Sequence, residues 1–287
     1  MKTSHSLKKV YNIVSIIVLI ALAICFVFPL YWFVTGAFKT PVSINSPVPD
    51  WIPKELVMDN FKKLFSRQTA PIFELGFIKG PQAPAAVRWM LNTVFMAIMA
   101  MVLTCLSASM AGYALAKKRF HGRVLLFTLI VCAMALPKQV ILIPLIREMS
   151  SLKLYNTIWA VILPTVGWPF GVFLMKQFSE GIPTEMLEAA RIDGASEFRT
   201  FTDIVFQMVK PGVGALAIFT FINSWNDYFM QLIMLSSTSN LTISLGIAKL
   251  QAENSTDFGL IMAGATLAAA PILIVCIALQ NYFTKGI

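Results

Sequence analysis

Long apolar runs separated by short polar segments dominate this chain of 287 residues. About 20 apolar residues in a helix are enough to cross the hydrocarbon core of a membrane. By this criterion the apolar runs predict six transmembrane helices. They lie at about residues 13–34, 89–116, 124–146, 158–178, 212–235 and 258–283. The third is expected to be interrupted at Pro137-Lys138 and Pro144. We therefore expect an all-α, polytopic membrane protein, with residues 1–12 as an N-terminal segment and residues 13–287 as one transmembrane domain.

Three polar segments between these runs are long enough to have structure of their own. Residues 35–87 contain seven prolines and are expected to form a long external loop, with a short helix near residues 58–65 where apolar residues have helical spacing. Residues 179–210 are amphipathic and are expected on the cytoplasmic side. Residues 236–257 are expected to form a second polar loop.

The distribution of Lys and Arg predicts the orientation of the helices. Cytoplasmic loops of membrane proteins carry an excess of basic residues. With both termini inside, twelve bases fall in the inner segments, and only three fall in the two short outer loops. The tightest basic cluster, residues 117–123, lies in the shortest loop. We therefore expect both termini to be cytoplasmic.

Composition agrees with a membrane protein and excludes several other classes. Hydrophobic residues make up 57% of the chain and charged residues 13%, whereas about 25% charged residues is typical of soluble domains. The formal net charge of +9 is attributed mainly to the basic residues that set the orientation of the chain in the membrane. A nucleic-acid surface is not expected, because the basic cluster contains a single aromatic residue, Phe120. The four cysteines form no C-x-x-C pair and both histidines lie outside the predicted helices. These features argue against a metal site, a cofactor or a catalytic centre in this chain.

The segment between the fourth and fifth predicted spans has clear local signals. A helix is predicted from Thr184 to Ile192, with acidic residues in its first turn. Gly194 suits the left-handed position that ends a helix, and Ser196 suits the N-cap of a second helix leading into the fifth span.

This predicted helix has the composition of a helix that inserts into a groove on a partner protein. A helix lying flat on lipid is the alternative. The candidate docking residues are Glu185, Met186, Leu187, Glu188, Ala189, Ala190, Arg191, Asp193 and Gly194.

Residues 188–190, Glu-Ala-Ala, are followed by three residues and then Gly194. This spacing resembles the EAA motif of the membrane subunits of bacterial ABC importers, in which E-A-A, three residues, G and nine residues precede I-x-L-P. The sequence departs from the motif at its end, where Phe206 and Gln207 stand in place of the usual Leu and Pro, and a proline follows at Pro211.

Other segments resemble the carbohydrate-uptake branch of the same importers. They are residues 224–227 (Ser-Trp-Asn-Asp), residues 280–283 (Gln-Asn-Tyr-Phe) and the pair Pro137 and Pro144. Over most of residues 10–286 the chain is similar to the second membrane subunit of maltose-type importers.

The resemblance implies a non-catalytic permease subunit of a sugar or oligosaccharide importer in the bacterial plasma (inner) membrane. It implies a second homologous permease subunit, two cytosolic ATPase subunits that bind ATP and Mg, an external solute-binding protein and surrounding membrane lipid. Residues 184–192 would be the coupling helix that docks on an ATPase, with Glu188 as a charged contact and Gly194 as the turn.

Two charged residues, Lys138 and Asp227, lie within predicted spans. A charge at the centre of a membrane costs about 3 kcal/mol on insertion scales. We therefore expect the two residues to pair or to meet water, or, alternatively, Lys138 to face a pathway and meet the carboxylate of an acidic sugar. The pathway candidates are Lys138, Trp168, Trp225, Asn226, Asp227 and Tyr228. The aromatic candidates are also typical of interfacial anchors.

Two other functions fit parts of the pattern. One is an ABC permease for a non-sugar solute, which lacks support from the sugar-type segments. The other is an ion-coupled secondary transporter, which should show two repeated halves, and no such repeat is evident in this sequence.

Overall fold

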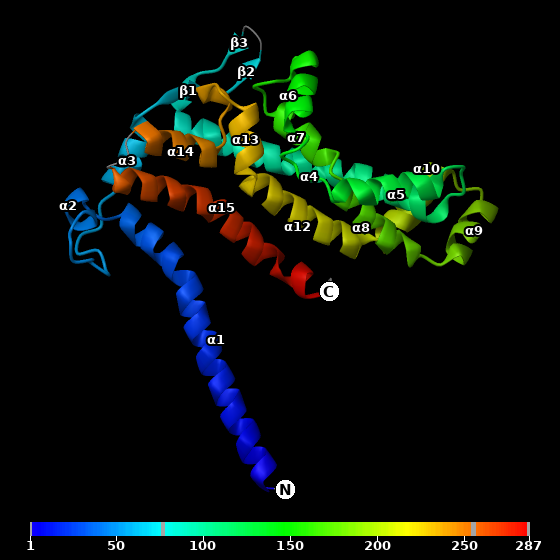
Figure 1. The fold of residues 1–287 in the computed structure, drawn as a ribbon, viewed down its shortest axis with the longest axis horizontal. Helices are drawn as coiled ribbons and strands as arrows, with labels where there is room; N and C mark the ends of the chain where they lie inside the picture. Colours follow the sequence, from blue (N-terminus) through cyan, green and yellow to red (C-terminus); the bar gives the residue numbers. More distant parts are fainter. Residues whose placement is uncertain (1, 76–77, 254–256, 286–287) are drawn as a thin grey trace. The chain divides into compact units, whose positions relative to one another are not determined.

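The computed structural model describes residues 2–75, 78–253 and 257–285 (Figure 1). The chain forms two compact units. One unit comprises Met1–Thr69 with Ile247–Ala270, and the other comprises Ala70–Gly246 with Pro271–Ile287.

The first unit is built around the long helix α1 (Lys2–Ala37), followed by α2 (Pro41–Ile44) and α3 (Asp59–Ser66). It also holds the first part of α15 (Phe258–Lys285). The buried amide of Asn60 in α3 donates hydrogen bonds to the carbonyls of Ala37 and Lys39 at 3.0 and 2.9 Å. These bonds fix the chain as it leaves α1, where the carbonyls at a helix end need partners.

The second unit contains most of the other helices. They are α4 (Ala85–Lys117), α5 (Arg123–Met134), α6 (Leu142–Ser151), α7 (Trp159–Val166), α8 (Pro169–Glu180), α9 (Thr184–Ile192), α10 (Glu197–Thr200), α11 (Phe206–Met208), α12 (Lys210–Asn226) and α13 (Tyr228–Met234). A π-helical turn, Phe201–Val205, joins α10 to α11, and a 3-10 turn, Thr238–Asn240, precedes α14 (Ile243–Glu253).

Helix α4 is the centre of the second unit and packs against α7, α8 and α12 (Figure 1). Gly112 in α4 sets its distance from α8, because a Cβ atom there would lie 2.6 Å from the backbone nitrogen of Lys176. A cluster of buried side chains fills the space around this contact and includes Tyr113, Met175 and Leu216. Leu187 of α9 and Val205 of the π-helical turn belong to the same cluster, so the segment between α8 and α12 is anchored in the core.

The structure confirms a mostly helical chain. Among the described residues, four helical segments are long and apolar enough to cross a membrane: Tyr11–Ala37, Ala85–Lys117, Trp159–Glu180 and Phe258–Val275. They overlap the first, second, fourth and sixth predicted spans.

The interruption predicted in the third span near Pro137 and Lys138 is confirmed, whereas the fifth span, predicted without a break, is also interrupted. The third consists of α5 and α6, separated at residues 135–141, because Pro137 lacks a backbone donor and disfavours a helical conformation in the residue before it. The fifth ends as α12 at Asn226 and resumes as α13 at Tyr228, with Asp227 between them at φ −76° and ψ 63°.

Two predictions about loops also need correction. Residues 236–257 are not a polar loop, because α14 occupies Ile243–Glu253 and buries Ile243, Ile247 and Leu250. Residues 35–87, which were predicted to form an external loop, contain the predicted short helix as α3 and also short strands that were not predicted. These are β1 (Thr69–Pro71) paired with β4 (Gln82–Pro84), and β2 (Glu74–Leu75) antiparallel to β3 (Ile78–Lys79).

Candidate functional site

Three apolar segments are interrupted, and each interruption carries one of the predicted pathway residues. Lys138 lies between α5 and α6, Trp168 lies between α7 and α8, and Asp227 lies between α12 and α13. Lipid cannot satisfy the polar groups of a broken helix, so such breaks occur where the backbone is packed in protein or lines a cavity. The three interruptions should therefore face the interior of the protein.

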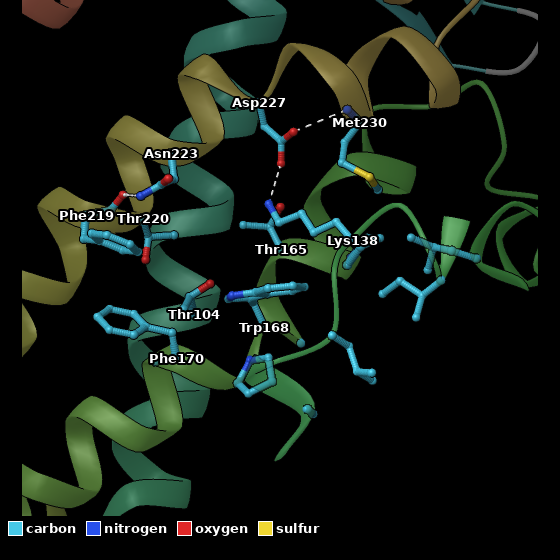
Figure 2. A pocket seen from close by; sticks show the side chains of 18 of the residues that line it. Thr104, Lys138, Thr165, Trp168, Phe170, Phe219, Thr220, Asn223, Asp227 and Met230 are labelled. Carbon is cyan, nitrogen blue, oxygen red and sulfur yellow. Dashed lines mark hydrogen bonds and ion pairs between the residues drawn. The ribbon is translucent and has the colours of Figure 1, made fainter. Parts of the chain in front are cut away.

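The interruptions come together around one ion pair (Figure 2). The Lys138 Nζ lies 2.8 Å from Asp227 Oδ2 and 5.0 Å from the centre of the Trp168 ring. The Asp227 side chain is 15% exposed and that of Lys138 is 41% exposed, so the carboxylate is the more enclosed partner. The two charges thus stabilise each other, and the Trp168 ring adds a cation–π contact to Lys138.

Asp227 also holds the start of α13. Its Oδ1 accepts a hydrogen bond from the backbone N–H of Met230 at 3.3 Å, which is the N-cap arrangement. One carboxylate therefore joins two functions: one oxygen binds Lys138 and the other caps a helix.

A cavity of about 370 Å³ lies beside the ion pair. Lys138, Trp168 and Asp227 line it, as do four uncharged polar residues. These polar residues are Thr104, Thr165, Thr220 and Asn223. Lys138 and Asp227 are the charged residues among its lining, so the part of the wall that the described residues form carries no net charge.

Sequence reasoning missed several residues of this cavity. Thr220 and Asn223 project from α12, two turns and one turn before Asp227 respectively, and the ring centres of Phe170 and Phe219 lie 4.6 Å apart at the edge of the cavity (Figure 2). The spacing of residues 220, 223 and 227 places them on one helical face and could have indicated a shared lining.

The other three pathway candidates do not line this cavity. Trp225 is buried at 2% exposure, whereas Tyr228 is 41% exposed. The Asn226 amide donates to the carbonyl of Ile222 at 2.9 Å, within its own helix. The segment of residues 224–228 therefore contributes Asp227 alone to the cavity wall.

The predicted helix between the fourth and fifth spans is present as α9, with the expected bounds. Its end forms two hydrogen bonds that define a Schellman motif, from the N–H of Gly194 to the carbonyl of Arg191 at 3.0 Å and from the N–H of Ala195 to that of Ala190 at 2.9 Å. Gly194 has φ +75° as predicted. Ser196 caps α10 through a bond from the Arg199 N–H, as predicted.

The nine predicted docking residues divide into two groups. Leu187 and Ala190 are each 6% exposed and face the interior of this chain, so they are not accessible to a partner. The remaining seven are exposed: Glu185, Met186, Glu188, Ala189, Arg191, Asp193 and Gly194. Ile192, the last residue of the predicted helix, is 87% exposed, and Phe198, which the prediction did not include, adds apolar surface at 74% exposure.

A sharp bend connects this segment to α12. The helical segments Glu197–Met208 and Lys210–Asn226 meet at 78°, with Val209 between them. Phe206 and Gln207, which replace the usual Leu and Pro of the EAA motif, lie in α11 just before this bend. Pro211 lies in the first turn of α12, a position that a proline tolerates well.

Residues 106–287 match the family described as "Binding-protein-dependent transport system inner membrane component". The chain belongs to this family. It is therefore a transport component, and its long apolar helices agree with a multi-pass protein of the bacterial plasma membrane.

Individual members of the binding-protein-dependent transport family are similar over nearly the whole chain. The arabinooligosaccharides transport system permease protein AraQ of Halalkalibacterium halodurans is 33% identical over 91% of this chain and 89% of its own length. The lactose transport system permease protein LacG of Rhizobium radiobacter is 30% identical over 97% of this chain and 96% of its own.

A solved structure shares the fold. A chain of a bacterial ABC transporter involved in the import of the acidic polysaccharide alginate aligns with a TM-score of 0.79 and 19% identity. The alignment covers 96% of this chain and 97% of that one.

The two functions of Asp227 can be separated by substitution. We expect Asp227→Ala to lower the thermal unfolding midpoint of the detergent-purified protein more than Asp227→Asn does. Asn retains an oxygen that caps α13, and loss of a cap costs about 1 kcal/mol. Asn226→Ala is the matched control, because its side chain bonds within α12. Equal losses for Asp227→Ala and Asp227→Asn would contradict the capping function.

Proposed function

We propose that this chain is a permease subunit of an ATP-driven importer for neutral sugars or oligosaccharides. The observation that carries the proposal is the cavity at the three helix interruptions, in a member of a family whose similar proteins are named for arabinooligosaccharides and lactose. The chain would supply half of the translocation pathway.

In this proposal the chain crosses the membrane six times, with both termini in the cytoplasm. The third crossing combines α5 with α6, and the fifth combines α12 with α13, each with its interruption at the cavity. The excess of basic residues in the inner segments supports this orientation. Residues 13–287 would act together as one permease domain.

The same proposal assigns the partners. A second, homologous permease subunit would complete the pathway, and an external binding protein would deliver the sugar. Two cytosolic ATPase subunits would bind ATP and Mg. The description of the family as binding-protein-dependent supports the external partner.

The charge of the cavity wall supports a neutral substrate. The Lys138 ammonium is already paired with Asp227, with 2.8 Å between Nζ and Oδ2, so the carboxylate of an acidic sugar would have to displace Asp227 from Lys138. Uncharged side chains such as Thr220 and Asn223 suit sugar hydroxyls, and Trp168 offers an aromatic face. A site of aromatic surface with a few polar groups is typical of small-molecule recognition.

Helix α9 would be the coupling helix. It presents Glu185, Glu188 and Arg191 together with the apolar Met186 and Ile192 to the outside. A short helix with an exposed face of this kind fits a groove on a partner.

The connection from α9 to the cavity is continuous. Leu187 anchors α9 in the core, and the segment after Gly194 leads through α10, the π-helical turn and α11 to the bend at Val209. Beyond the bend, α12 carries Thr220, Asn223 and, at its end, Asp227. A displacement of α9 by the ATPases would thus reach the cavity along one chain segment, as in a rigid-body switch.

Reconstitution tests this function directly. We expect the chain to co-purify with a second permease and two ATPase subunits, and we expect the complex in liposomes to take up neutral oligosaccharides only with ATP and the binding protein. Uptake of uronic-acid oligosaccharides of equal length is expected to be weaker. Uptake driven by an ion gradient without ATP would overturn the proposal, and preference for a non-sugar solute or for the acidic sugars would overturn its substrate class.

The turn after α9 allows a second test. Nothing lies within 4 Å of a Cβ atom at Gly194, so a substitution there acts through the backbone at φ +75°. We expect Gly194→Val to abolish most substrate-stimulated ATP hydrolysis, because a β-branched residue resists positive φ, and Gly194→Asn to retain most of it. The measurement is ATPase activity of the assembled complex with loaded binding protein. Unchanged stimulation in Gly194→Val would remove the coupling function from this turn.

A further inference from the structure

Part of the basic cluster at the end of α4 is bound to the protein itself. The Lys118 ammonium donates a hydrogen bond to Glu197 Oε2, at the start of α10. The Arg191 guanidinium, in the last turn of α9, lies 3.5 Å from the other oxygen of Glu197. One carboxylate therefore joins the ends of three helices, α4, α9 and α10.

We propose that Glu197 is a positioning residue that, with Lys118 and Arg191, fixes the orientation of α9 relative to α4. We call these three residues the clasp. The inference rests on the proposed function of α9 as the coupling helix. By fixing the angle between α9 and α4, the clasp would make α4 follow a movement of α9.

Lys118 is a suitable fixed point for the clasp. It directly follows α4, and its ammonium lies 5.1 Å from the centre of the Tyr113 ring. Tyr113 is 6% exposed and belongs to the buried cluster around α4 and α8. The hydrogen bond from Lys118 also holds the pKa of Glu197 below its usual range, which favours the charged carboxylate that the clasp needs.

The entry to α9 is held by the neighbouring residue. The Lys117 ammonium donates to the carbonyls of Glu180 and Ile182, at 3.0 and 2.6 Å. These carbonyls lie at the end of α8 and just beyond it, where helix carbonyls need partners. Lys117 therefore fixes the chain before α9, and the clasp fixes it after α9.

Stability alone does not account for the clasp. The side chains of Arg191 and Glu197 are 60% and 61% exposed, and ion pairs at such exposure contribute about 0–1 kcal/mol. Apart from the clasp, α9 and α10 are joined by the short turn at Gly194, between Ile192 and Glu197. The gain from the clasp lies in restricting the angle at this turn.

A distance measurement tests the orientation itself. Spin labels are placed at Ile192→Cys in α9 and Met110→Cys in α4, both exposed positions, in a chain whose four native cysteines are replaced by alanine. We expect Glu197→Gln and Lys118→Gln each to broaden the distance distribution, and Lys118→Arg to keep it narrow. The double variant Glu197→Gln/Lys118→Gln should be no broader than Glu197→Gln alone, since Glu197→Gln already removes the contact with Lys118.

Arg119→Gln is the matched control, because it removes a neighbouring exposed base and leaves the clasp intact. An unchanged distribution in Glu197→Gln, or equal broadening in Arg119→Gln, would overturn the proposal. This readout needs no transport, so it stands apart from failure of the proposed function.

The assembled complex provides the functional readout. We expect Glu197→Gln to retain basal ATPase activity and to lose about 3- to 10-fold of its stimulation by loaded binding protein, a range expected for residues in a coupling network. Full stimulation in Glu197→Gln, together with ATP-driven transport in the unmodified complex, would overturn the clasp and leave the permease function standing.

Discussion

The ion pair between Lys138 and Asp227 is the interaction on which the arrangement of the cavity depends. Two charges in apolar segments are expensive unless each has a partner, and these two are 89 residues apart in the sequence. Their pairing requires the interruption between α5 and α6 to meet the interruption between α12 and α13. The break that carries Trp168 lies against the same pair. The three helix interruptions, the Lys138–Asp227 ion pair and the Trp168 ring therefore lie together, and they line the cavity.

In the proposed function, the rest of the second unit would transmit a movement of α9 to the cavity. Gly112 lets α4 and α8 approach closely, and the buried cluster around them includes Leu187 of α9. The bend of 78° turns the chain from the segment after α9 into α12. Because α12 runs without interruption from the bend to Asn226, the segment after α9 and the cavity wall belong to one stretch of chain, along which the proposed movement of α9 would reach the cavity.

The sequence predicted local features well where a residue type has one strong structural preference. The bounds of α9, the left-handed Gly194 and the N-cap Ser196 all follow from such preferences. It failed where the answer depends on distant partners. Leu187 and Ala190 were assigned to the docking surface because helical spacing does not tell which face the protein itself covers.

The apolar runs show the same limit. Pro137 marks the break between α5 and α6 in the sequence, but no comparable local signal marks the break at Asp227, whose carboxylate pairs with Lys138 in the folded chain. Thr220 and Asn223 gave no signal as single residues, since Thr and Asn also occur on ordinary helix surfaces, and only their helical spacing with Asp227 could have indicated a shared lining. Helix α14 was missed because its short apolar face, with Ile243, Ile247 and Leu250, is diluted by polar neighbours.

The central claim is that the cavity beside the ion pair is part of a pathway opened and closed by ATP. The direct test places one cysteine at Asn223 in a chain without native cysteines, within the assembled complex in liposomes. Its rate of reaction with a membrane-impermeant thiol reagent is measured without nucleotide and with ATP trapped on the ATPases. Leu106→Cys, on the exposed face of α4, is the control. The account predicts a several-fold change at position 223 between the two states and none at position 106. Equal rates at position 223 in both states, or no reaction in either, would contradict it.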